Sequence, residues 1–336
     1  MRTRIIGLYI VLAAGNLVAW AWAIVAFRGD AVLLGTAFLA YTFGLRHAVD
    51  ADHIAAIDNV TRKLMQEGQR PVGVGFYFSL GHASVVALAS AVVAFAATAL
   101  QSSLESYRVI GGIIGTSVSA FFLFGIAAVN LIVLGAVYRS FRKVRRGGAL
   151  EEDDLETLLR KRGLLARLFR PLFRLIGRSW HMLALGFLFG LGFDTATEIA
   201  VLAMAAEAAK IHPLWFVMVY PALFAAGMAL VDATDGVLML GAYGWAFVKP
   251  IRKLYYNLVI TAVSVVVAVL IGGIEALGLV ADQFGLEGPF WSFIDALNDN
   301  FGNLGYLIIG VFVASWVVSI AVYRWKRYDE LDAAGG

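Results

Sequence analysis

Long apolar stretches separated by short polar segments run along the whole 336-residue chain. The stretches cover residues 5–27, 31–59, 72–99, 109–138, 180–205, 213–242, 254–281 and 303–324. They mostly exceed the ~18 residues that mark a helix able to cross a bilayer. The pattern therefore predicts an all-α integral membrane protein with eight transmembrane helices, numbered here as spans one to eight.

Composition agrees with this interpretation and excludes a soluble protein. Hydrophobic residues make up 60% of the chain and charged residues 15%, whereas soluble domains contain about 25% charged residues. The absence of Cys excludes disulfides, thiolate metal sites and redox dithiols. The expected surroundings are a lipid bilayer, and we expect neither a nucleic acid nor an obligatory protein partner.

Lys and Arg fall almost entirely on one side of the predicted spans. Of the 27 Lys and Arg, 23 lie in the two termini and in alternate connections, three lie in the other connections, and Arg46 lies inside span two. The positive-inside rule then predicts a protein of the cytoplasmic membrane with both termini in the cytoplasm. The first apolar stretch is too long for a signal peptide, so we expect it to remain as span one.

One long connection divides the chain into three parts. Residues 1–138 hold spans one to four, and residues 180–336 hold spans five to eight with a short cytoplasmic tail. Residues 139–179 between them are basic and amphipathic, which is typical of a segment on the inner membrane surface. We expect the three parts to form one transport domain.

Nine ionisable residues lie inside predicted spans two, three, five and six. They are His47, Asp50, Asp52, His53, His82, Asp194, Glu198, Asp232 and Asp235. One such group at mid-membrane costs at least ~2.5–3.5 kcal/mol, so nine groups need a common compensating partner. Imidazole and carboxylate together are ligands for a divalent cation such as Ni²⁺, Co²⁺, Mn²⁺ or Zn²⁺ rather than Cu(I).

The depth of these groups points to a single site. His47, His82, Asp194 and Asp232 lie roughly 10–14 residues from the cytoplasmic ends of their spans, which is about 15–21 Å along a helix. On a continuous helix, His47, Asp50 and His53 share one face. Asp52 lies off that face, so either it balances charge behind the ligands or the helix is distorted, which Gly44 would permit.

At these residues the sequence resembles the nickel/cobalt transporter family of eight-span permeases. The family motif of His, four residues and Asp-His is matched by His47 and Asp52-His53 in span two. Three further family motifs resemble Phe78–Val86 in span three, Leu191–Glu198 in span five and Gly227–Asp235 in span six. The resemblance implies uptake of Ni²⁺ or Co²⁺ as the transported substrate, with no bound cofactor.

Matching tripeptides suggest an internal repeat. Phe43-Gly44-Leu45 and Gly81-His82-Ala83 are followed later in the chain by Phe189-Gly190-Leu191 and Gly227-Met228-Ala229, each pair with the same internal spacing. Spans two and five run in opposite directions, so spans two and three would be related to spans five and six as inverted repeats. Many secondary transporters with mid-membrane sites have this architecture.

Two other functions remain as alternatives. Efflux relatives share the span-two motif but often carry a His-rich loop, and the absence of His from residues 139–179 favours uptake. An intramembrane metalloenzyme is disfavoured because the chain lacks a His-Glu-x-x-His motif and contains only five His. The chain also lacks a phosphate-binding loop of the Gly-x-x-x-x-Gly-Lys type, so transport is not expected to use ATP through that motif.

Overall fold

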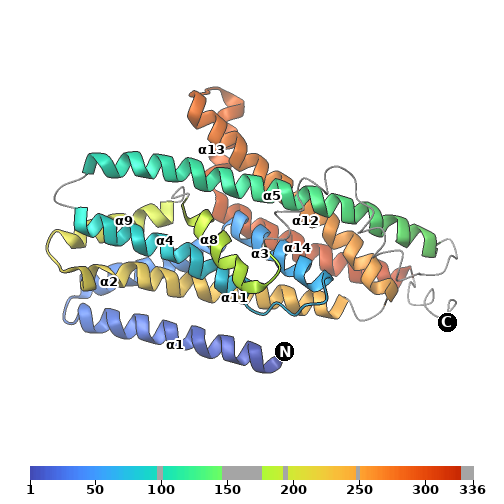
Figure 1. Ribbon diagram of the computed structural model, residues 1–336, viewed down its shortest axis with the longest axis horizontal. Helices are drawn as coiled ribbons and strands as arrows, with labels where there is room; N and C mark the ends of the chain where they lie inside the picture. Colours follow the sequence, from blue (N-terminus) through green and yellow to red (C-terminus); the bar gives the residue numbers. More distant parts are fainter. Residues whose placement is uncertain (97–100, 146–175, 192–195, 247–249, 327–336) are drawn as a thin grey trace.

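The computed structural model describes residues 1–96, 101–145, 176–191, 196–246 and 250–326, and within these ranges it contains helices and no strands. Figure 1 shows the longest helices running along one common axis. The elements are α1 (Arg2–Ala26), α2 (Ala31–His47), α3 (Ala51–Gln66), α4 (Val74–Ala96), α5 (Gln101–Arg145), η1 (Ser179–His181), α8 (Met182–Gly190), α9 (Ala196–Ala209), α10 (Leu214–Val217), α11 (Val219–Ala246), α12 (Pro250–Phe284), α13 (Pro289–Asn298) and α14 (Phe301–Trp325).

Five helical segments in the described ranges are long and apolar enough to cross a membrane. They are Arg2–Ala26, Val74–Phe95, Leu214–Gly244, Leu258–Phe284 and Asn303–Trp325. The pair α2 and α3 passes the same test as one bent span. The predicted all-helical architecture is confirmed, with five or six candidate spans. The count of eight also needs spans within α5 and across α8 and α9, so it stays a prediction.

Predicted span two is interrupted rather than continuous, and part of predicted span five, residues 192–195, lies outside the described residues. In span two, α2 ends at His47 and α3 begins at Ala51, with an angle of 52° between them. In span five, α8 ends at Gly190 and α9 begins at Ala196. The calculation that placed the span-two ligands on one face of a continuous helix therefore does not apply, and the distorted helix is the correct alternative.

Glycines allow four helices to pack with their backbones in close contact. A Cβ built on Gly81 of α4 would lie 2.0 Å from the Leu183 carbonyl oxygen of α8, and one on Gly44 of α2 would lie 2.1 Å from the Phe224 carbonyl oxygen of α11. Gly186 and Gly227 make the reciprocal contacts from α8 and α11. Gly44 therefore serves close packing, since it lies within α2 rather than at the break.

The remaining long helices flank this four-helix core on different sides. On one side α5 packs against α12, and α14 lies against α3 and α12. Gly305 of α14 lies directly against the Val49 carbonyl, so α14 supports the break between α2 and α3. On another side α1 packs on α11, where the Tyr9 hydroxyl donates to Thr234 over 3.2 Å. Figure 1 shows α13 projecting from the side of the bundle.

The close contact between α4 and α8 gives a test of this packing. We expect Gly81→Ala to lower the thermal unfolding temperature of the detergent-solubilised protein, because the new methyl group would overlap the α8 backbone. Overpacking of this kind costs about 1–3 kcal/mol. Gly241→Ala in α11 is the matched control, because no atom lies within 4 Å of its added Cβ. Equal unfolding temperatures for Gly81→Ala and the unmodified protein would contradict this description of the interface.

Candidate metal centre

The break between α2 and α3 places two histidines at a helix end and a helix start. His47 is the last residue of α2 and His53 lies in the first turn of α3. Asp50 between them is the N-cap of α3, a position that Asp favours. Its side chain makes no capping hydrogen bond, however, and instead accepts one from His47 Nδ1 at 2.9 Å. The cap residue thus orients the histidine that precedes it.

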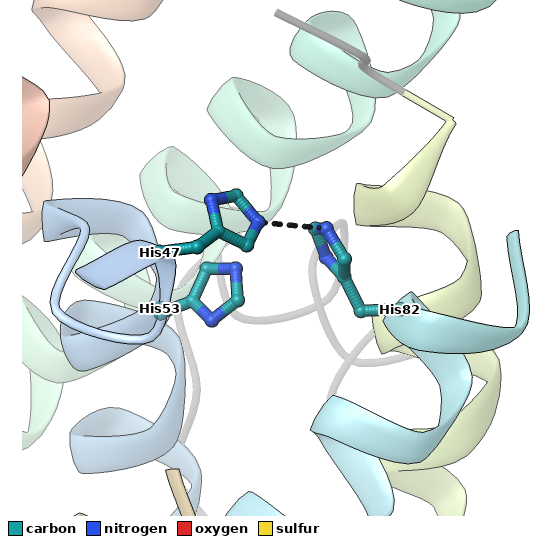
Figure 2. A group of neighbouring side chains, drawn as sticks. All are labelled: His47, His53 and His82. Carbon is teal, nitrogen blue, oxygen red and sulfur yellow. Dashed lines mark hydrogen bonds between the residues drawn. The ribbon is translucent and has the colours of Figure 1, made fainter. Parts of the chain in front are cut away.

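The third histidine comes from α4 and completes a compact cluster. His82 Nε2 lies 2.9 Å from His47 Nε2, and the His53 ring lies 4.7 Å from the His47 ring and 4.8 Å from the His82 ring, measured between centroids. One ligand nitrogen from each of the three lies within 4.8 Å of the other two. Figure 2 shows the three rings gathered around one point, with His82 facing the other two across a small gap.

Carboxylates from the second half of the chain reach the same cluster. Glu198 in the first turn of α9 has Oε1 2.8 Å from His82 Nε2 and 3.8 Å from His47 Nε2. Asp232 of α11 has both oxygens 3.3 Å from His53 Nδ1. All of these side chains are buried. The cluster therefore combines three imidazoles with at least three carboxylates, including Asp50, out of contact with solvent.

The hydrogen bonds orient His47 and His53 in the manner of metal ligands. An ionised carboxylate only accepts hydrogen bonds, so Nδ1 of His47 and Nδ1 of His53 carry the protons that face Asp50 and Asp232. Their Nε2 lone pairs are then left for the centre of the cluster, and His53 Nε2 has no hydrogen-bond partner among the described residues. A carboxylate on the far ring nitrogen is the usual arrangement behind a metal-bound histidine.

The distances at the centre also suit a metal ion. Because His47 Nε2 is an acceptor, the proton between the two imidazoles belongs to His82 Nε2, which faces both His47 Nε2 and Glu198 Oε1. A metal–nitrogen bond of about 2.1 Å places two ligands at right angles about 3.0 Å apart. The separations of 2.9 and 2.8 Å match that spacing, whereas His47 Nε2 and Glu198 Oε1 lie 3.8 Å apart. These three atoms thus face one position that a cation could share.

Aromatic side chains pack around the imidazoles. The Phe78 ring of α4 lies edge-on to the His53 ring at 4.8 Å, and the Phe224 ring of α11 lies 5.4 Å from the His47 ring. Both phenylalanines are fully buried. They keep the rings in place and lower the local dielectric constant, which strengthens the attraction between a cation and the carboxylates.

The predicted site residues divide into three groups. The structure brings together His47, Asp50, His53, His82, Glu198 and Asp232. Asp52 and Asp235 lie near this cluster without a hydrogen bond or ion pair to a residue in the described ranges. Asp52 is within electrostatic range of all three histidines, and Asp235 lies one helical turn from Asp232 on α11. Asp194 falls outside the described residues.

Several buried polar residues near the cluster were not anticipated from the sequence. Thr197, beside Glu198, places its hydroxyl oxygen 3.4 Å from His47 Nδ1, and its place in the span-five motif was the signal that could have revealed it. Further along α3, Asp58 accepts hydrogen bonds from Tyr243 and from Ser264. Arg62, one turn beyond Asp58, is fully buried and donates to Thr261 and Asn59. Buried ionisable side chains therefore continue along α3 beyond the histidines.

Comparison with known proteins matches residues 33–322 to the NicO family, described as high-affinity nickel-transport proteins. The chain is 60% identical to a high-affinity nickel transport protein of Cupriavidus necator, over 98% of this chain and 95% of that protein. It is 49% identical to the nickel transporter NixA of Staphylococcus aureus, over 89% and 88% of the two chains.

A relative with a different named metal is the cobalt transport protein NhlF of Rhodococcus rhodochrous, 41% identical over 88% of this chain and 84% of that protein. No protein of solved structure shows significant similarity to the chain. The family match covers most of the sequence and includes every residue of the histidine cluster. The chain therefore belongs to the NicO family of high-affinity nickel-transport proteins, and it is a transporter rather than an enzyme.

Proposed function

We propose that this protein takes up Ni²⁺, and also Co²⁺, across the cytoplasmic membrane through a site formed by His47, His53 and His82. The observation that carries the proposal is the convergence of His47 Nε2, His82 Nε2 and Glu198 Oε1 from three different helices. Imidazole nitrogen with carboxylate oxygen is a donor set suited to these borderline cations. The names of the relatives, nickel transporters and one cobalt transporter, agree with this choice of substrate.

Binding exchanges the water shell of the ion for protein ligands. The imidazoles supply neutral nitrogens, and the carboxylates of Asp50, Glu198 and Asp232 balance the two positive charges in a buried environment. For Nε2 of neutral His82 to bind the metal, its proton has to move to Nδ1, which has no hydrogen-bond partner among the described residues. An inside-negative membrane potential favours inward movement of a dication by about 4.6 kcal/mol per 100 mV.

We extend the proposal to eight spans arranged as two inverted repeats, α2–α4 and α8–α11. Counterparts lie 146 positions apart, as Phe43 and Phe189 do, and Gly81 and Gly227. The helix contacts follow the same relation: α2 packs on α11 as α8 packs on α4, and α3 packs on α11 as α9 packs on α4. The first repeat begins with the bent pair α2 and α3. Rocking of one repeat against the other then exposes the site to each side in turn.

The repeat relation makes Asp52 the counterpart of Glu198. They too lie 146 positions apart, and each occupies the first turn of a helix, Asp52 in α3 and Glu198 in α9. Glu198 contacts the histidine cluster, whereas Asp52 is partly exposed and makes no hydrogen bond to a described residue. When inverted repeats exchange conformations, their equivalent residues exchange surroundings. Asp52 therefore approaches the ion in the oppositely facing state, and Glu198 withdraws.

The role of the histidine cluster is tested by uptake of radioactive nickel into cells. We expect His47→Ala to lower the initial rate by at least about 10-fold, because metal-site substitutions of even supporting residues cost about 10–100-fold. His212→Ala is the control, since that ring stacks on Phe216 away from the cluster. Undiminished uptake by His47→Ala rejects the proposed site, and extrusion of preloaded nickel by the unmodified protein would favour efflux instead.

The orienting role of Asp50 predicts a change in affinity more than in maximal rate. Asp50→Asn still accepts a hydrogen bond but loses the negative charge behind His47, so we expect KM for Ni²⁺ to rise about 10–100-fold. The measurement is the concentration dependence of nickel uptake at matched expression. Asp30→Asn is the control, because Asp30 is exposed and caps the start of α2, and Asn caps a helix equally well. An unchanged KM would show that Asp50 does not act through His47.

Binding and transport should separate at Asp52 and Glu198. We expect Glu198→Gln to weaken equilibrium nickel binding to the purified protein at least about 10-fold, as for other groups at a metal site. Asp52→Asn should retain binding while losing most flux in proteoliposomes. Glu207→Gln, exposed at the end of α9, is the control. Equal loss of binding in Asp52→Asn and Glu198→Gln would rule out an exchange of roles between the two carboxylates.

A further inference from the structure

A groove lies between the start of α1 and the start of α4, away from the histidine cluster. Two arginines line it from separate segments: Arg4 belongs to α1 and Arg70 precedes α4. Tyr77 of α4 and Ser179 of η1 add hydroxyl groups, and Leu8 and Phe76 supply apolar surface. None of the described residues that line the groove is acidic. It is therefore positively charged at its rim and apolar along its walls.

Neither arginine is neutralised by a residue in the part of the chain that the structure describes. Both side chains are exposed, and neither makes a hydrogen bond or ion pair with any residue in the described ranges. Both belong to the predicted cytoplasmic side, where most of the basic residues lie. Two unpaired guanidinium groups that face one groove at that level suit a phosphate group, which arginine binds through paired N–H donors.

The groove lies between two candidate membrane spans, α1 and α4. Most of α1 is exposed, and it is attached chiefly to α11, through the Tyr9 contact and through Asn16, which donates to the Ala226 carbonyl at 3.4 Å. Leu8 and Phe76 offer an apolar wall along which an acyl chain can lie. A headgroup site joined to an apolar wall distinguishes a phospholipid from a free phosphate ion.

We propose that this groove binds an anionic phospholipid of the inner leaflet. The headgroup phosphate lies between Arg4 and Arg70, with the Tyr77 and Ser179 hydroxyls as further donors, and an acyl chain follows the apolar wall. Basic pockets between transmembrane helices on the cytoplasmic side are known to bind anionic headgroups. A lipid bound in the groove connects α1 to α4 on the side where Arg4 and Arg70 lie.

This position has a consequence for transport that rests on the proposed function. α1 is attached to α11 of the second repeat, whereas α4, which carries His82, belongs to the first. A lipid that connects α1 and α4 therefore connects the two repeats on the cytoplasmic side. It would slow their separation there and so lower the rate at which the ion is released inward. Lipid binding itself does not depend on this mechanism.

The experiment measures lipid binding to the purified protein by native mass spectrometry and by the shift in unfolding temperature. The probes are short-chain phosphatidylglycerol, phosphatidylcholine with the same chains, and inorganic phosphate. We expect phosphatidylglycerol to bind the unmodified protein about 30-fold more tightly than phosphatidylcholine, as expected for two basic contacts. The double variant Arg4→Gln with Arg70→Gln should bind both lipids equally.

A matched double variant separates a defined site from general surface charge. Arg324→Gln with Lys326→Gln removes two exposed cations from the same predicted side of the membrane, and it should keep the preference for phosphatidylglycerol. Equal loss in both double variants, equal binding of the two lipids to the unmodified protein, or full competition by inorganic phosphate would each overturn the proposal. Retained equilibrium nickel binding confirms that the variants are folded, so a failed lipid test leaves the metal site standing.

Discussion

The structure depends on one electrostatic requirement, which is that a buried group of carboxylates and imidazoles must be compensated inside an apolar bundle. Each charged group at mid-membrane depth is costly by itself. Here Asp50 is paired with His47, Asp232 with His53 and Glu198 with His82, so every carboxylate in the cluster has an imidazole partner. These pairs leave ring nitrogens directed at a common centre. The same contacts that make burial tolerable thus prepare a site for a dication.

The break between α2 and α3 brings the histidines of span two to a common centre. On a continuous helix, residues six apart such as His47 and His53 are separated by most of two turns along the axis. With the chain interrupted after His47 and restarted at Ala51, the two rings come within 4.7 Å of each other. Broken helices at a central site are a recurrent feature of transporters with inverted repeats. Glycine contacts between α2 and α11 and between α4 and α8 hold the four helices close enough for the groups to meet.

Charge along α3 and α11 extends beyond the histidines. Asp58 is held by Tyr243 and Ser264, and the guanidinium of Arg62 is buried among neutral partners. Arg62 lies one helical turn from Asp58 on α3, so these two opposite charges are buried close together.

Composition and pattern alone were sufficient for the helical class, the family resemblance and most of the cluster. Apolar length is set by bilayer thickness, and ionisable residues inside such stretches are rare enough to be informative one by one. His47, His53, His82, Glu198 and Asp232 were therefore recognisable before any coordinates. The break after His47 was not, because Asp50 is compatible both with a helix interior and with a cap. Thr197 and Arg62 were missed for a similar reason, since the role of each side chain depends on the residues that it contacts in the folded protein.

Only the tertiary structure could separate the carboxylates that touch an imidazole from those that do not. Asp52 is adjacent in sequence to His53, and Asp235 lies one turn from Asp232, yet neither makes the direct contacts that Asp50 and Asp232 make. Residue type and spacing describe what a side chain can do within its own helix. Which of several acids reaches the histidines is decided by how α3, α4, α9 and α11 pack, and that packing depends on backbone contacts between residues far apart in the chain.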